Sequence, residues 1–145
     1  MSTQHMKRGF TIIEVVLVLA IAALIFLMIF VALPALQASQ RDTSRKQDAS
    51  IVSAAVTKYT SSERKAINSS TSAADLQQYV DDLDQYEVSN VRIASVGANP
   101  NGDEILVYPR ARCDGSQAVV ANNARKSAVR IMLDNGKTFH CVDAS

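Results

Sequence analysis

The sequence contains little glycine, little proline and almost no surplus charge, and it lacks the short signatures of common catalytic sites. Its 145 residues include 5 Gly and 3 Pro, which excludes collagen-like and low-complexity proteins. The formal net charge of +1 gives no overall bias toward nucleic acid or an acidic substrate. No phosphate-binding glycine loop, HExxH, GxSxG or Cys/His set at metal-ligand spacing occurs. We therefore expect a protein that is not an enzyme and has no catalytic residues, no metal and no cofactor.

The most prominent feature that is present is one long apolar run near the amino terminus. Residues 10–36, the apolar segment, contain only three residues that are not apolar: Thr11, Glu14 and Pro34. Residues 15–36 carry no charge, and as a helix they would span roughly 33 Å, enough to cross a bilayer core. The rest of the chain suffices for one small domain with a thin core. The sequence therefore predicts one membrane anchor and a small head.

The apolar segment has three interpretations. A secretory signal peptide cleaved after Ala38 would have an apolar core of about 7–15 residues, which is shorter than this one. A plain anchor fits the length, but it explains Glu14 only if that carboxylate reaches the membrane surface. An anchor cut between Gly9 and Phe10 explains Glu14 directly, because the new α-amino group of Phe10 in a neighbouring copy could pair with it.

The octapeptide at residues 7–14, KRGFTIIE, followed by the apolar segment, resembles the processing site of type IV prepilins. The resemblance covers residues 6–59. It implies cleavage by prepilin peptidase after Gly9, N-methylation of Phe10 and a role for Glu14 in assembly. It also implies an α+β pilin fold, in which the first half of a long helix is transmembrane and the second half packs on a small antiparallel sheet.

The resemblance implies a structural subunit of a type IV pilus, polymerised into a surface filament for adhesion or twitching motility. Its partners would be copies of itself, prepilin peptidase and, indirectly, the assembly platform and its ATPase. The monomer would lie in the cytoplasmic membrane with its head outside, and the assembled protein would be extracellular. A minor pilin, or a pseudopilin of type II secretion or competence, would share these features. A non-polymerising tethered or secreted binding domain is a further alternative.

Four segments follow from this interpretation: a removed leader (1–9), a transmembrane and filament-core helix (10–36), an amphipathic second half of that helix (37–66) and a globular head (67–145). In the second half, Ala49, Val52, Val56 and Tyr59 recur at helical spacing, which predicts one helix from near Phe10 to about residue 65. Pro34 should loosen the preceding turn of this helix.

The head is predicted to contain a short helix and about four strands. The helix covers residues 75–86 and could be capped by Ser72 or Asp75. Alternation of apolar residues begins near Val88, and further strands are expected at 104–108, 128–133 and 137–142. Asp134-Asn135-Gly136 predicts a hairpin between the last two. We expect one antiparallel sheet on the second half of the long helix, with residues 114–127 forming an irregular excursion.

Cys113 and Cys141 are the only cysteines. In a secreted head they would form one disulfide, whereas in a cytosolic domain they would be free thiols. A disulfide that closes the carboxy-terminal segment also resembles many pilins. His140 stands alone and is interpreted as a strand residue.

Charge is unevenly distributed in the head. Residues 75–87 contain five acids and no base, whereas residues 104–141 contain six bases and three acids. Solvated faces would explain this pattern, and so would contacts between stacked subunits. DNA capture by the basic strands is possible but less favoured, because aromatic residues for stacking on bases are not interleaved with them.

Overall fold

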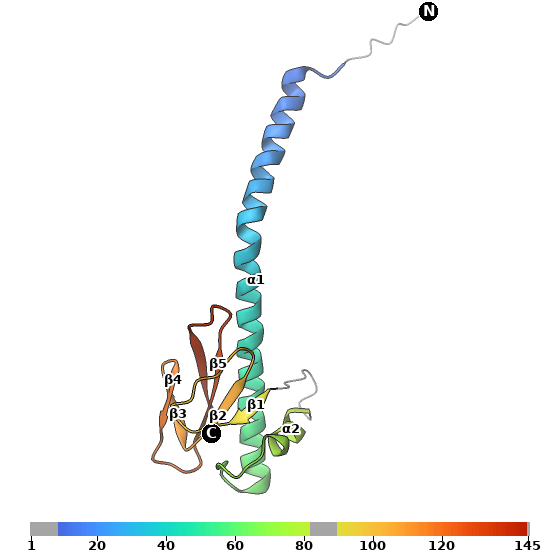
Figure 1. Cartoon of the computed structure of the whole chain (residues 1–145). Coiled ribbons are helices and arrows are strands. Elements are labelled where there is room, and N and C mark those ends of the chain that lie inside the picture. Colours follow the sequence, from blue (N-terminus) through green and yellow to red (C-terminus); the bar gives the residue numbers. More distant parts are fainter. Residues whose placement is uncertain (1–8, 82–89, 145) are drawn as a thin grey trace, which may run out of the picture. The chain divides into compact units, whose positions relative to one another are not determined.

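The protein is α+β with a pilin-like architecture. A computed structural model describes residues 9–81 and 90–144, and in these residues α1 (Ile12–Glu63) is followed by α2 (Ala73–Asp81) and six strands (Figure 1). The chain divides into two compact units, Met1–Ala38 and Ser39–Ser145. The second, called the globular unit below, holds the second half of α1, α2 and the strands. The predicted fold class is thus confirmed.

The first unit holds the first half of α1, whose side chains find little to pack on within this unit. The large apolar side chains of the apolar segment are exposed; Phe10 is 85% exposed and Phe30 75%. By length and composition α1 could cross a membrane. The helix continues through Pro34, which has no N–H to donate to the carbonyl of Phe30.

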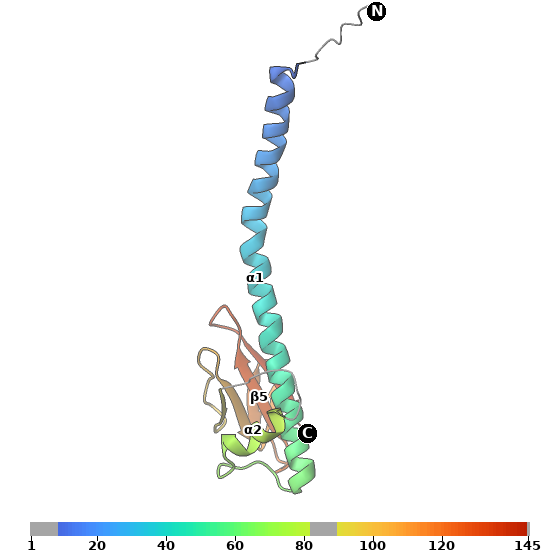
Figure 2. The same ribbon diagram turned by 90° about the vertical axis from the view of Figure 1, so that its right-hand side faces the viewer.

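In the globular unit, one four-stranded sheet packs on the second half of α1. Its strands are β1 (Val91–Ile93), β2 (Ile105–Pro109), β5 (Ser127–Met132) and β6 (Phe139–Ala144), in the order β1-β2-β5-β6. Figures 1 and 2 show the second half of α1 and α2 on one side of this sheet. The core between these layers includes Val52, Val56, Leu76, Val107 and Val129, all at most 2% exposed.

A separate hairpin covers the opposite face of the sheet. It consists of β3 (Ala111–Asp114) and β4 (Gln117–Val120), which pair antiparallel. Its Ala111 forms a second buried cluster with Leu106, Tyr108 and Ala128, which alternate with the residues that face α1. Both faces of β2 and β5 are therefore buried, which explains why apolar residues run almost continuously through these strands.

The local signals in the head gave several correct predictions. β5 and β6 form the predicted hairpin, and Gly136 in its turn has φ 66°, as a tight turn after Asn135 favours. The predicted helix at 75–86 begins at Ala73, and its part beyond Asp81 lies outside the described residues. Ser72 caps it: the Asp75 amide donates to Ser72 Oγ at 3.2 Å, and the Ser72 amide donates to Asp75 Oδ2 at 3.0 Å.

Two predictions about the sheet were wrong. β1 pairs parallel with β2, so the sheet is mixed rather than antiparallel throughout. Alternation of apolar residues is the same in both pairings and does not reveal strand direction. The expected irregular excursion at 114–127 contains β4, because the chain reverses at Gly115, where φ is 61°. Gly115 and Ser116 form the two-residue loop between the paired residues Asp114 and Gln117, and a glycine at the first loop position is a turn signal that could have indicated this hairpin.

Cys113 and Cys141 form a disulfide that joins β3 to β6, with their Cα atoms 5.8 Å apart. Beside it, the Cys113 amide donates to Asp143 Oδ1 at 2.7 Å. Arg130 lies under the same hairpin and is only 7% exposed. Its guanidinium donates to the carbonyl of Ser116 and to Asn99 Oδ1, both at 2.8 Å, and stacks 4.0 Å from the centre of the Phe139 ring. The hairpin is therefore held by the disulfide, by the hydrogen bond from Cys113 to Asp143 and by the hydrogen bond from Arg130 to Ser116.

Replacing both cysteines (Cys113→Ser with Cys141→Ser) should lower the free energy of unfolding by about 3–4 kcal/mol, because the open chain regains loop entropy when it unfolds. Thermal unfolding of the full chain in detergent, followed by circular dichroism, measures this loss. The wild type treated with a reductant should approach the double variant, and the double variant should not respond to the reductant. An equal response of both proteins would contradict a stabilising bridge.

Candidate functional site

The first candidate site is the start of α1, where the sequence predicts cleavage between Gly9 and Phe10. Both residues are exposed and precede the helix, which begins at Ile12. A Cβ placed on Gly9 would meet no atom within 4 Å, and its backbone is not in the left-handed region. The fold therefore does not require glycine at this position. The leader residues Lys7 and Arg8 lie outside the described residues.

Glu14 lies in the first turn of α1, on an open hollow with Phe10, Val15, Val18 and Leu19. Its amide donates to the carbonyl of Thr11 at 3.1 Å, which starts the helix. A carboxylate at this point is stabilised by the unpaired amides and the dipole of the helix start. Thr11 and Glu14 have the spacing of a capping box, but the bonds observed here run from the Glu14 and Val15 amides to the Thr11 carbonyl.

Glu14 is the one acid on this otherwise apolar hollow. No ion pair of Glu14 occurs within the described residues. The side chain is exposed and available to a cation from outside the chain. The structure thus brings Phe10 and Glu14 to one surface of the first turns of α1, as their sequence spacing predicts.

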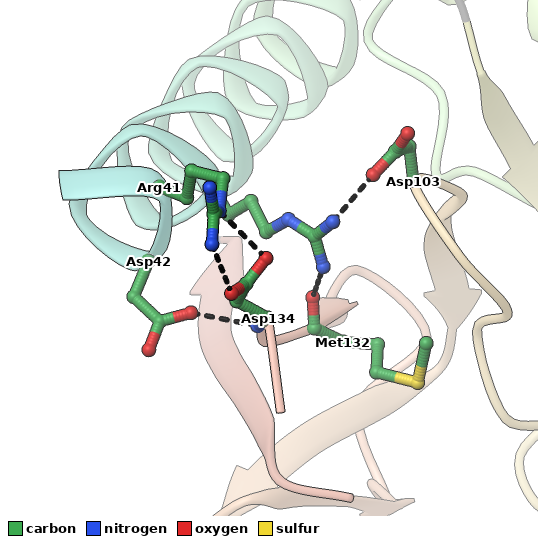
Figure 3. A network of polar contacts seen from close by, with 6 residues as sticks. Arg41, Asp42, Asp103, Met132 and Asp134 are labelled. Atoms are coloured by element: carbon green, nitrogen blue, oxygen red, sulfur yellow. Dashed lines mark hydrogen bonds and ion pairs between the residues drawn. The ribbon is translucent and has the colours of Figure 1, made fainter. Parts of the chain in front are cut away.

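A second polar site joins α1 to the turn between β5 and β6 in the globular unit (Figure 3). The Arg41 guanidinium donates to both carboxylate oxygens of Asp134, Nε to Oδ1 at 2.9 Å and Nη2 to Oδ2 at 3.0 Å. Asp42, the next residue in α1, also binds Asp134: its Oδ1 accepts a hydrogen bond from the Asp134 amide at 2.7 Å. The hydrogen bond from Arg41 lowers the pKa of Asp134 and raises the pKa of Arg41.

Arg45 lies one turn further along α1 and connects this network to the loop before β2. Its Nη2 contacts Asp103 Oδ1 at 2.6 Å, and its Nη1 donates to the carbonyl of Met132 at 2.9 Å. The Arg45 side chain is 21% exposed and Asp103 76%, whereas Arg41 is 57% exposed and Asp134 25%, so each ion pair has one partner that is largely in water. Sequence reasoning missed this network, because its partners are separated by 58 to 93 residues and leave no local pattern.

The described residues contain no group of three or more His, Cys, Asp and Glu side chains that could hold a metal ion. Nor do they bring the notable side chains of the two sites into an arrangement for acid-base or nucleophilic chemistry. The first site is an apolar surface with one carboxylate, and the second consists of ion pairs and hydrogen bonds.

Comparison with known proteins finds one match. Residues 4–30 match the family of the prokaryotic N-terminal methylation motif, which is the class III signal peptide of type IV pilins. No curated protein and no solved structure matches the chain. The motif covers Gly9, Phe10, Glu14 and most of the apolar segment, and together with the α+β architecture it supports a type IV pilin-like protein.

Asp134→Asn should flatten the dependence of stability on acid pH. Since Arg41 holds the folded-state pKa of Asp134 below its usual value, the ionised form stabilises the fold above the unfolded-state pKa of about 4. That stabilisation is lost as the pH falls through the lower folded-state pKa. The melting temperature of the full chain in detergent should therefore fall more steeply for the wild type than for the variant between roughly pH 7 and pH 3.

Asp114→Asn is the matched control, because Asp114 is an exposed carboxylate at the end of β3 without an ion pair in the described residues. It should keep the slope of the wild type. Equal slopes for the wild type and Asp134→Asn would show that the Arg41 pair does not stabilise the globular unit.

Proposed function

We propose that this chain is a structural subunit of a type IV pilus, cut after Gly9, methylated at Phe10 and polymerised through its first helix into a surface filament. The observation that carries the proposal is the methylation motif at residues 4–30, placed on a helix whose apolar side chains are exposed. In this interpretation residues 1–9 are the leader, 10–36 the membrane and filament-core helix, 37–66 its amphipathic second half and 67–145 the head.

The exposed apolar segment supports storage in a membrane followed by self-assembly. Burying one large apolar side chain is worth roughly 1.5–3 kcal/mol, so leaving this many in water is strongly unfavourable. Within its own unit the segment finds no partner, since none of its most apolar window is buried. Lipid can cover it before assembly and the same segment of neighbouring copies can cover it afterwards. The head would then form the filament surface.

Glu14 and Phe10 would set the axial position of each helix relative to its neighbours in this packing. A carboxylate transferred into an apolar helix bundle is costly unless a cation pairs with it. Cleavage after Gly9 creates an α-amino group on Phe10, at the same end of the helix as Glu14. Pairing of this amine with Glu14 of an adjacent copy satisfies both charges and fixes the axial offset between helices.

Recognition by a peptidase explains Gly9, which neither packing nor backbone conformation demands. The motif also implies the usual partners in general terms, prepilin peptidase and the machinery that drives polymerisation. A minor pilin or pseudopilin would carry the same motif, and the abundance of the chain in surface filaments separates these from a main subunit.

The proposal predicts that material sheared from cell surfaces contains a chain that begins at methylated Phe10. Intact mass and amino-terminal sequencing measure this directly. Gly9→Glu should leave an uncut precursor in the membrane, and because no atom lies near the position of its Cβ, the globular unit should keep its disulfide and its melting temperature. A wild-type chain that begins at Ser39, or an uncut Met1, would overturn the filament proposal.

Glu14→Gln should leave processing at Gly9 intact but lower the filament yield by at least about tenfold, since the Phe10 amine then lacks its partner in an apolar setting. Glu14→Asp, which keeps the charge on a shorter side chain, should retain part of the yield. The readout is the ratio of sheared filament to processed subunit in the membrane. A tethered domain that does not polymerise would tolerate Glu14→Gln with its surface function unchanged.

A further inference from the structure

A basic hollow lies where α1 ends in the globular unit. The last turn of α1 forms one wall, and the loop between β4 and β5 forms the other. Arg64, just beyond the helix, adopts φ 53°, which is the left-handed conformation that commonly ends a helix. The hollow has a volume of about 540 Å³. Its lining residues are Thr60, Ser61, Arg64, Asn123, Arg125 and Lys126.

Three of these side chains are cations without a partner. Arg64, Arg125 and Lys126 are exposed, and within the described residues their side chains take part in no ion pair or hydrogen bond. By contrast, Arg41, Arg45 and Arg92 all pair with carboxylates. Among the residues that the structure describes, no acid lines the hollow. The surface therefore offers concentrated positive charge and fits a ligand that carries several anionic groups.

The backbone holds the cations in place. In the loop, the Lys126 amide donates to the carbonyl of Asn123 at 3.2 Å, and the Arg125 amide donates to Asn123 Oδ1 at 2.9 Å. The Lys126 carbonyl accepts the Ala111 amide from β3 at 3.2 Å. Since Asn123 accepts through its oxygen, its amide NH2 group is left to donate to a ligand. The hollow is thus formed before any ligand arrives.

The chain itself contains an anionic segment of suitable chemistry. Residues 75–87, the acidic stretch, carry five carboxylates and no base, and the chain as a whole is close to neutral. Residues 82–87 of this stretch lie outside the described residues. No aromatic side chain lines the hollow, so it lacks a stacking surface for the bases of a single-stranded nucleic acid. The charges therefore favour a carboxylate-rich protein segment over a nucleic acid.

We propose that the basic hollow binds the acidic stretch of a second copy of this chain. The hollow of one copy then binds a different segment of the other, so the first copy keeps a free acidic stretch and the second keeps a free hollow. Such a heterologous contact adds further copies without limit unless its rotation closes a ring. The inference rests on the proposed filament and names a contact between heads that supplements packing through the first helix. Because the contact is ionic, salt should weaken it.

The test uses charge reversal in the full chain, expressed in a strain that lacks the wild-type copy. Arg125→Glu with Lys126→Glu should lower the filament yield by about tenfold or more, since like charges then face each other. Asp81→Lys, Asp82→Lys and Asp84→Lys together should do the same from the other side, since they change the acidic stretch from five negative charges to a net charge of +1. The five changes combined in one chain exchange the signs of both patches, because the hollow, which keeps Arg64, becomes net −1 and the acidic stretch becomes net +1. The yield should return to within about twofold of the wild type.

Controls separate loss of the contact from loss of the fold. Arg112→Glu with Lys137→Glu makes the same change in net charge at exposed positions outside the hollow, and its yield should stay near that of the wild type. For every variant, the membrane pool of processed, disulfide-bonded chain serves as the denominator. Mixing the two single-patch variants in one cell should also restore filaments, because each then offers what the other lacks.

Two results would overturn the contact while leaving the filament standing: a normal yield from Arg125→Glu with Lys126→Glu, or a combined variant that stays as low as its parents. If Arg125→Glu with Lys126→Glu gives a normal filament yield but its sheared filaments no longer bind duplex DNA, the hollow would be a nucleic-acid site instead. A wild type that gives no filament, or one that does not begin at Phe10, would overturn the proposed function and the contact with it.

Discussion

The structure depends on one constraint: the apolar segment at residues 10–36 exposes large side chains that its own compact unit does not cover. Phe10 is 85% exposed and Phe30 75%, and a helix with so much apolar surface is not stable on its own in water. Under the proposed function this segment is covered first by lipid and later by other copies. The globular unit would then fold without help from this segment, and Glu14 would pair with a cation of a neighbouring copy.

The globular unit can build a core of its own from few residues because its sheet is covered on both faces. The second half of α1 and α2 cover one face, and the β3-β4 hairpin covers the other, so β2 and β5 are buried on both sides. The disulfide between Cys113 and Cys141 and the buried Arg130 hold the hairpin in place. Arg41 and Arg45 attach the β5-β6 turn and the loop before β2 to α1, at the beginning of this unit.

The sequence predicted features that depend on local chemistry and missed those that depend on distant contacts. The long helix, the turn at Gly136 and the cap at Ser72 follow from periodicity and a few neighbouring residues, and the structure contains all three. The Arg41 network and the basic hollow bring together residues from α1 and from loops far along the chain, which no window of sequence reveals. The parallel pairing of β1 was missed for a related reason, since alternation reports which face is buried and not the direction of a neighbouring strand.

The difference between local features and distant contacts also explains why the amino-terminal motif can be recognised from the sequence, whereas the binding surfaces of the head cannot. Around Gly9 and Phe10 the fold imposes few demands, and the space where a Gly9 Cβ would point is empty. Residue identities there are free to follow demands from outside the fold, which under the proposed function are a peptidase and a neighbouring helix, so they appear as a compact pattern. In the head, every exposed charge also has to suit the strand or loop that carries it, and lone acids or bases become informative only once the fold gathers them. The basic hollow is such a case, because Arg64 at the end of α1 comes to lie beside Arg125 and Lys126 only in the folded chain.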